Sequence, residues 1–427
     1  PPPKKGAEEG EAPPARGGRY RFNWNTPYVL SHHNSHILYA GGNYVFKSVK
    51  KGDDFKIISP DITRTKHGSA TAISESPRNA DVLWAGTDDG NLWITRNGGI
   101  EWKNVAQKVG LKKPFWVATI EASRFAEGRA YVAFDAHRSD DDAPYVYMTD
   151  DFGETWKPIT GNLPTGSTRC LREDIANQNL LYCGSEFALF VSLDRGGSWT
   201  KINNNTPQGS LPTVAVHEVA IHPTAGEIVA ATHGRSLWIL DITPIRQMAS
   251  ESVKEKAHLY KPNTVVRWQE MPSRGRTGRR FVGENPPRGA QIFYSLPKKA
   301  TKVTVQVQDI EGKTLTELNG TTAEGLNKVV WNTSMRPTGA GGPAVAGGGR
   351  GPGGGGGAAG GAGGGGGGGG RFGAGGFGRQ VPAGTYRLVL NVDGESLIQS
   401  LTIEGDPVPP RSLTADDEDD DDDLDKE

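Results

Sequence analysis

Membrane spans and zinc sites have little support in this sequence. Only two cysteines and four methionines occur among its 427 residues, and no Cys/His spacing typical of zinc ligands is present. No apolar run reaches the roughly 18–20 residues that span a bilayer. The chain starts at Pro1 without a signal-peptide core or an initiating methionine, so we expect a mature fragment whose address signal lies elsewhere.

The chain as a whole also lacks an excess of charge of one sign, although its charged residues are unevenly distributed. The net charge is −1, but residues 415–427 hold ten acids and one lysine, which leaves +8 for the rest of the chain. Neither value is extreme enough to favour a nucleic-acid partner, and the acidic end is expected to be solvated.

Glycine, proline and tryptophan are plentiful, at 59, 28 and 10 residues. Long helical periods are absent, and short alternating runs bounded by turn residues predict an all-β protein. The expected organisation is a loop leader (1–19), propeller blades (20–245), a linker with a basic loop (246–288), a β-sandwich (289–406) with a glycine-rich insertion (341–380), and an acidic disordered tail (407–427).

A repeated motif, [ST]-x-[DN]-x-G-x-x-[WF], indicates the fold. Its copies start at Thr95, Thr149 and Ser192, and a worn copy starts at Ser48, so the spacings are 47, 54 and 43 residues, about one propeller blade each. The hydroxyl and the acid or amide can close a tight turn, and the aromatic can pack between neighbouring sheets. The predicted structural residues are Thr95, Asn97, Gly99, Trp102, Thr149, Asp151, Gly153, Trp156, Ser192, Asp194, Gly197 and Trp199.

Five blades are expected between residues 20 and 245, each with an inner strand A, strands B and C, the motif at the C–D turn, and an outer strand D. This pattern resembles the Asp-box (BNR-repeat) propellers of the sortilin (VPS10)-like group, including bacterial secreted proteins often labelled glycosyl hydrolases. The stretches that carry the resemblance are Phe22–Pro27, Ala85–Gly90 and Thr232–Asp241. It implies a secreted, periplasmic or cell-surface location, and it does not decide whether the protein is an enzyme.

Members of that group usually have seven or more blades. We therefore expect an N-terminal fragment or subunit to complete the propeller, with a closed five-bladed ring as the alternative.

The turns between strands B and C should form one polar rim. Candidate catalytic carboxylates there are Asp88, Asp135 and Glu186, and candidate ligand-binding residues are Asp89, His137, Arg138, His233 and Arg235. Paired carboxylates could hydrolyse a glycoside, whereas arginines could clamp an acidic ligand. The remaining interpretation is that these residues only cap turns.

Three functions stay open: a propeller that binds a glycan or a protein at this rim, a glycoside hydrolase that uses its carboxylates, and a structural assembly subunit. No metal or other cofactor is predicted, with one exception: Asp140–Asp142 is a candidate calcium loop, for which a solvated loop is the alternative. Polar residues on inner strands, among them Glu75, Arg172, Glu173 and Glu218, are expected to pair between blades.

Cys170 and Cys183 flank a hairpin whose centre we place between residues 176 and 177. Directly opposed cysteines would be at bridging distance, so a disulfide is predicted, with two reduced core thiols as the alternative. In the last domain, strand-like runs such as Lys302–Val307 predict an Ig- or FnIII-like sandwich, similar to that of flagellar-hook capping proteins.

Overall fold

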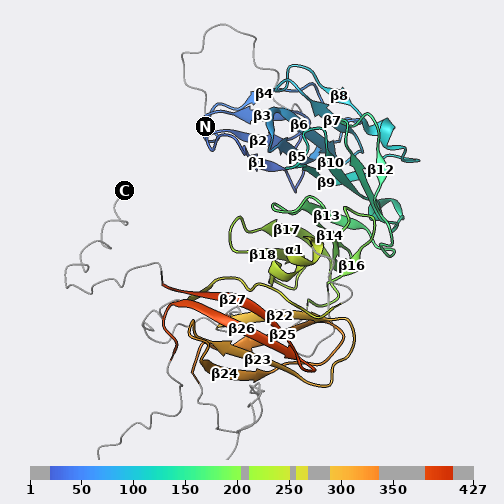
Figure 1. The fold of residues 1–427 in the computed structure, drawn as a ribbon. Helices are drawn as coiled ribbons and strands as arrows, with labels where there is room; N and C mark the ends of the chain where they lie inside the picture. The colour runs from blue at the N-terminus through green and yellow to red at the C-terminus, as the bar shows by residue number, and fades with distance from the viewer. Residues whose placement is uncertain (1–19, 203–210, 251–255, 268–288, 336–379, 407–427) are drawn as a thin grey trace, which may run out of the picture. The chain divides into compact units, whose positions relative to one another are not determined.

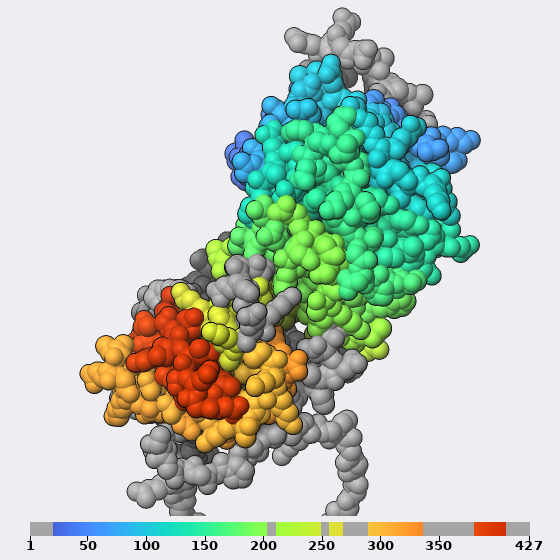
Figure 2. Space-filling view, turned by 45° about the vertical axis from the view of Figure 1, so that its right-hand side comes forward, coloured from blue at the N-terminus to red at the C-terminus, as the bar shows by residue number. Residues whose placement is uncertain are grey.

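The computed structural model describes residues 20–202, 211–250, 256–267, 289–335 and 380–406. The chain divides into two compact units, Pro1–Glu251 and Ser252–Glu427. The first unit is coloured blue to green and the second yellow to red (Figure 2). The glycine-rich insertion, the basic loop and the acidic tail lie outside the described residues.

The first unit consists of five antiparallel sheets, which we call blades 1 to 5 in chain order. Their strands are β1 (Tyr28–Leu30), β2 (Leu38–Gly41), β3 (Val45–Ser48) and β4 (Lys56–Ile57); β5 (Ala70–Ser76), β6 (Asn79–Thr87), β7 (Leu92–Thr95) and β8 (Lys103–Asn104); β9 (Trp116–Ala122), β10 (Ala130–Asp135), β11 (Tyr145–Thr149) and β12 (Lys157–Pro158); β13 (Thr168–Glu173), β14 (Leu181–Ser185), β15 (Leu189–Ser192) and β16 (Thr200–Lys201); and β17 (Val216–Ile221), β18 (Glu227–Thr232) and β19 (Leu237–Asp241).

The blades are arranged as a β-propeller, which confirms the predicted fold class. Within each blade the strands pair in chain order, and the first strands β1, β5, β9, β13 and β17 follow a C-shaped inner row (Figure 1). Blade 5 differs from the expected four-stranded pattern. It has three strands and lacks the turn motif, and helix α1 (Thr243–Ser250) follows instead, so a fourth strand after the C strand was wrong for this blade.

Apolar side chains fill each of the four boundaries between consecutive blades. Alternation along the strands places one set of side chains toward the preceding blade and the other toward the following blade. Examples of the buried residues are Tyr39, Val45, Ile73 and Leu83 between blades 1 and 2; Trp84, Leu92, Ile120 and Val132 between blades 2 and 3; Tyr131, Val146, Leu171 and Phe190 between blades 3 and 4; and Tyr182, Leu189, Val219 and Ile228 between blades 4 and 5.

The repeated motif closes the turn between the third and fourth strands. In blade 3, Gly153 N–H donates to Thr149 Oγ1 (2.9 Å) and Thr155 N–H donates to Asp151 Oδ1 (2.8 Å). The same pair of bonds recurs in blades 2 and 4. In blade 4 the glycine at the equivalent position is Gly196, with a φ of 86°, rather than the predicted Gly197, because Gly196 donates to Ser192 Oγ.

The motif tryptophans reach the preceding blade. Trp102 Nε1 donates to the Ile58 carbonyl (2.6 Å) and Trp199 Nε1 donates to the Ile159 carbonyl (2.8 Å). The ring of Trp156 packs edge-on against Trp84, with centroids 6.0 Å apart. Each motif therefore ties its blade to the one before it.

Two buried carboxylates, one at each of two boundaries, also join neighbouring blades. Glu173 in blade 4 accepts hydrogen bonds from Ser123 Oγ (2.9 and 2.8 Å), Arg124 N–H (2.8 Å) and Tyr131 Oη (3.0 Å) of blade 3. Its side chain thus satisfies three donors of the neighbouring sheet, two of which belong to buried residues.

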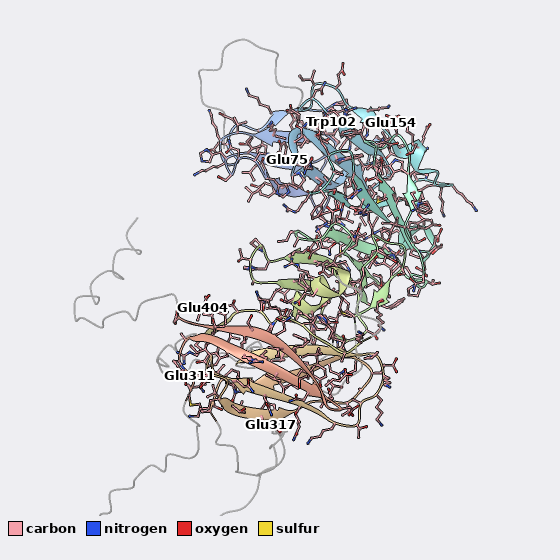
Figure 3. All side chains as sticks on the ribbon, in the orientation of Figure 1. Glu75, Trp102, Glu154, Glu311, Glu317 and Glu404 are labelled. Carbon is pink, nitrogen blue, oxygen red and sulfur yellow. The ribbon has the colours of Figure 1, made fainter. Side chains whose placement is uncertain are left out.

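Glu75 in blade 2 repeats this arrangement at the first boundary. It accepts from Ser31 Oγ (2.9 Å), His32 N–H (2.6 Å) and Tyr39 Oη (3.0 Å) of blade 1. Glu75, labelled in Figure 3, lies on the inner side of the row of blades. Both carboxylates are thus bonded by uncharged donors, whereas the expected ion pairs between blades are formed by Arg172 with Glu218 and Glu121.

The cysteine prediction was wrong. Cys170 lies opposite Gly184 and Leu171 lies opposite Cys183, so the hairpin is centred on residue 177 rather than between 176 and 177. A shift of one residue turns a side chain to the other face of a sheet. Both thiols are buried and free, and burial raises the pKa of Cys170 to about 12.

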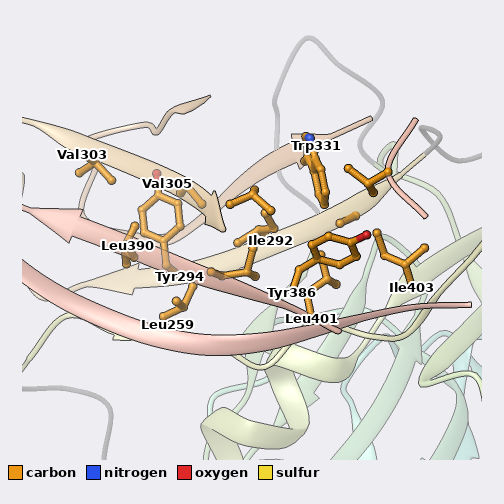
Figure 4. Close-up of a cluster of buried hydrophobic side chains, with 14 of the residues drawn as sticks. Leu259, Ile292, Tyr294, Val303, Val305, Trp331, Tyr386, Leu390, Leu401 and Ile403 are labelled. Atoms are coloured by element: carbon orange, nitrogen blue, oxygen red, sulfur yellow. The ribbon is translucent and has the colours of Figure 1, made fainter. Parts of the chain in front are cut away.

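The second unit is a two-sheet β-sandwich, as predicted. One sheet has the order β20 (His258–Leu259), β22 (Ala290–Leu296), β25 (Gly325–Trp331), and the other the order β21 (Val265–Arg267), β27 (Glu395–Gly405), β26 (Gly384–Val392), β23 (Val303–Gln308), β24 (Thr314–Asn319). Its core lies between the sheets and includes Ile292, Tyr294, Trp331 and Leu390 (Figure 4). Strands β20 and β21 belong to this sandwich, although the sequence placed them in a linker, because they pair with β22 and β27.

Candidate functional site

The turns between the second and third strands gather polar side chains of blades 3, 4 and 5 at one place. We call Asp135, His137, Arg169, Glu186, His217 and His233 the rim cluster. Asp135 ends β10, Glu186 follows β14 and His233 follows β18. Arg169 and His217 lie near the start of inner strands β13 and β17, which begin on the same side of the propeller.

Arg169 is the centre of the rim cluster. Its guanidinium bonds Asp135 of the preceding blade through Nη1 and Glu186 of its own blade through Nη2, and its Nε also donates to Glu186 Oε2 (3.0 Å). The side chains of Asp135 and Arg169 are 6% and 14% exposed, whereas Glu186 is 36% exposed. The carboxylate nearest to solvent therefore belongs to Glu186.

Three histidines surround this ion pair. His137 Nδ1 lies 2.6 Å from Asp135 Oδ1, and His217 Nε2 lies 3.4 Å from His233 Nδ1. Burial lowers the pKa of His217, and the nearby charge of Arg169 lowers it further. The neutral imidazole is thereby favoured, which leaves His217 with one donor and one acceptor nitrogen.

Aromatic surface borders the rim cluster. The Phe187 side chain follows Glu186 and is 52% exposed. The Arg138 guanidinium lies over the Trp116 ring, 5.0 Å from its centroid, so this predicted ligand-binding residue already has an aromatic partner.

Other predicted site residues lie elsewhere or have structural contacts. Asp88 accepts from Ser69 N–H (2.9 Å), Ser69 Oγ (3.0 Å) and Asn23 Nδ2 (3.2 Å). Asp89 accepts from the N–H groups of Arg64 and Thr65. Both side chains therefore cap loops at blade 2, and the structure does not bring them together with Asp135 and Glu186.

The candidate calcium loop is also engaged internally. Asp141 accepts from Tyr145 Oη (2.8 Å) and Ala143 N–H (3.1 Å). Across the described residues of both units, no group of three or more His, Cys, Asp or Glu side chains is arranged to hold a metal ion. Arg235 is exposed and lies in the turn after β18, two residues after His233.

Arg169 was not among the residues predicted from the sequence, either at the turns or on the inner strands. Arg169 stands on an inner strand two residues after Ser167, as His217 stands two residues after Ala215, and the contacts of Ser167 and Ala215 become visible only in the structure. The carbonyls of Ser167 and Ala215 accept from Glu186 N–H and His233 N–H, respectively. In blade 2 the residue at the corresponding place, Thr71, instead donates to the Val117 carbonyl.

A second polar group lines the central hollow, which has a volume of about 340 Å³. Arg172 bonds Glu218 of blade 5 (2.7 Å) and lies 3.5 Å from Glu121 of blade 3. Burial raises the pKa of Glu121 to about 7, although the charge of Arg172 opposes this effect.

The raised pKa of Glu121 predicts a pH-dependent stability. The folded protein holds this proton more tightly than the unfolded chain, whose glutamate pKa is 4.5. The stabilisation is therefore complete below about pH 4.5 and is lost as the pH rises through 7, by about 3 kcal/mol in all. Glu121→Gln should remove this contribution, so its unfolding free energy relative to the wild type should rise between pH 4.5 and 8 in denaturant titrations. A constant difference across that range would contradict the prediction.

No helix in the described parts of the chain is long and apolar enough to cross a membrane.

Neither a family model nor a curated protein matches this chain. Solved structures do resemble it. The GH74 xyloglucanase from Xanthomonas campestris is 14% identical with a TM-score of 0.41, over 49% of this chain and 35% of that one. YCF48 bound to D1 peptide is 13% identical with a TM-score of 0.36, over 54% and 67%. The Niastella koreensis GH74 enzyme is 14% identical with a TM-score of 0.39, over 65% and 41%. This chain thus spans well under half the length of either GH74 enzyme, and at these identities no activity transfers from them.

Proposed function

We propose that this chain is a ligand-binding propeller that uses the rim cluster to hold a glycan. The observation that carries this proposal is the convergence of five polar side chains from three consecutive blades around Arg169. Such a set offers both hydrogen-bond donors and acceptors in fixed positions, which suits a ligand rich in hydroxyl groups.

Rigidity supports binding at this site. Arg169 is held from two sides, and His137 is held by Asp135, so little side-chain freedom would be lost when a ligand binds. Phe187 supplies an exposed apolar face next to Glu186, on which the apolar face of a sugar ring can lie.

The hydrolase alternative has weaker support from the geometry. Glycoside hydrolysis uses one protonated and one ionised carboxyl group on opposite sides of the scissile bond. Asp135 and Glu186 instead bond the same guanidinium, which occupies the space between them. Binding without turnover is therefore the expected result.

A location outside the cytoplasm is part of this proposal. It rests on the resemblance to secreted sortilin-like propellers, because the two free thiols lend it no support.

A glycan array probed with the purified full chain tests the proposal. Glu186→Gln should weaken binding to any glycan hit about 10- to 100-fold, because a hydrogen bond to a charged group contributes roughly 1.5–3 kcal/mol. The matched control is Glu154→Gln, since Glu154 lies in a C–D turn and bonds Lys103 and Lys108 (Figure 3). Product analysis on each hit distinguishes binding from hydrolysis. Hits that bind both variants equally well, or no hit at all, would refute a glycan site at the rim cluster.

A further inference from the structure

The two ends of the row of blades expose apolar residues whose equivalents in the other blades are buried. Leu237 is the first residue of β19, as Val45, Leu92 and Leu189 are the first residues of β3, β7 and β15. Those three are 0%, 0% and 2% exposed, because the following blade covers them, whereas Leu237 is 66% exposed.

The register of the sheets shows that these positions are equivalent. The bond that closes the turn before the third strand runs from Thr87 N–H to the Asn91 carbonyl in blade 2, and from Thr232 N–H to the Ser236 carbonyl in blade 5. Leu92 and Leu237 are the next residues in each case. Two residues further on, Ile94 is 3% exposed and Ile239 is 65% exposed.

Blade 1 has the complementary exposed face. Tyr28 of β1 pairs with Ala40, as Ile73 pairs with Ala85 and Leu171 pairs with Cys183 in the other inner strands. Ile73 and Leu171 are 7% and 0% exposed, but Tyr28 is 61% exposed. Its neighbour on the same face, Leu30, is 59% exposed.

We propose that both faces bind further propeller blades carried by a partner polypeptide, so that blade 5 packs on one added sheet and blade 1 on another. Exposed apolar patches of this kind mark interaction sites. The equivalent positions of the other blades form the contacts between neighbouring blades. We therefore expect the partner to supply a sheet with alternating apolar residues.

The segments of the printed sequence that lie outside the described residues do not offer such a sheet. Each blade takes 43 to 54 residues of alternating sequence, and the longest undescribed stretch, residues 336–379, is glycine-rich. Glycine-rich sequence has too few side chains to cover an apolar face.

A second copy of this chain also fits poorly. Val29 and His32 of blade 1 and Val219 of blade 5 line the same central hollow of about 340 Å³, so both ends of the row approach one axis. A second row of five equally curved blades needs as much room around that axis as the first. A second copy would therefore have to place five more blades around the same axis.

Site-specific photocrosslinking in cells that naturally express the full chain tests this proposal. The crosslinking residue p-benzoylphenylalanine replaces Leu237 in one variant and Tyr28 in another. Ile100 is the control position, because it is 84% exposed but lies in a C–D turn away from both faces. The expected result is that Leu237 and Tyr28 crosslink the same foreign polypeptide, through segments of alternating apolar sequence, and that Ile100 does not.

The neighbouring substitution Ile239→Asp should lower the Leu237 crosslink about tenfold or more, since it places a charge in an apolar contact. Ile239 is already exposed in the isolated chain, so the thermal unfolding of this variant should match the wild type. Crosslinks to a second copy, crosslinks to residues 252–427 of the same chain, or yields no higher than at Ile100 would overturn the proposal.

Discussion

Replacing Trp84 by alanine is expected to lower the free energy of unfolding of the propeller by about 3–5 kcal/mol. Trp84 is fully buried between blades 2 and 3 and packs against Trp156 of the next turn motif. Its removal leaves a cavity in the largest boundary cluster and also removes the contact of that motif. A denaturant titration followed by tryptophan fluorescence measures the loss.

Two controls separate packing from polarity. The Trp84 Nε1 atom is buried and has no hydrogen-bond partner among the described residues, so Trp84→Phe should cost clearly less than the alanine variant. Trp24→Ala should change stability by less than about 0.5 kcal/mol, because Trp24 is 80% exposed. Equal losses for Trp84→Ala and Trp24→Ala would show that the boundary does not hold the blades together.

Glu173→Ala is expected to cost a comparable amount, about 3–5 kcal/mol. It removes the acceptor of Ser123 Oγ, Arg124 N–H and Tyr131 Oη. Tyr131 and Ser123 are 0% and 1% exposed, so water cannot replace the lost bonds without opening the boundary. Each orphaned buried donor costs roughly 1–3 kcal/mol.

The loss should be confined to the propeller. Hydrogen exchange should therefore increase in β9, β10 and β13 but not in the sandwich. Glu173→Gln keeps one acceptor oxygen and should fall between the alanine variant and the wild type. Glu317→Ala, at an exposed position on β24, should leave stability within about 0.5 kcal/mol. An unchanged midpoint for Glu173→Ala would mean that this carboxylate does not join the blades.

The pairing of Glu173 with Tyr131 also explains why Trp84 lacks a partner. Tyr131 and Trp84 occupy equivalent positions on the second strand of their blades. Opposite Tyr131, blade 4 provides Glu173, whereas blade 3 has Ala122 at the matching place. At this place the acceptor is present opposite the hydroxyl of Tyr131 and absent opposite Trp84.

Most of the propeller was predictable from local sequence. The motif spacing predicted where blades repeat, because a turn needs its hydroxyl, acid and glycine at fixed offsets within one short segment. Runs in which apolar and polar residues alternate predicted the strands, because this alternation is also a property of a short segment. The turns that carry Asp135, Glu186 and His233 were also placed correctly on this basis.

Errors arose where a single residue changes the outcome. The register of the hairpin between Cys170 and Cys183 differs by one position from the symmetric estimate, and that difference sends the two thiols to opposite faces of the sheet. Strands β20 and β21, of two and three residues, fell within the predicted linker 246–288. Their pairing partners, β22 and β27, lie far away in sequence, so the local sequence does not identify these partners.

Local sequence thus determined the all-β class, the repeat and the position of each turn, because short-range hydrogen bonds and alternation decide these features. Tertiary structure alone decided that Arg169 lies between Asp135 and Glu186, since the three residues come from different strands of two blades. It also decided that Leu237 and Tyr28 are exposed while their equivalents are buried. Burial depends on what packs against a face, and that neighbour lies outside any local stretch of sequence.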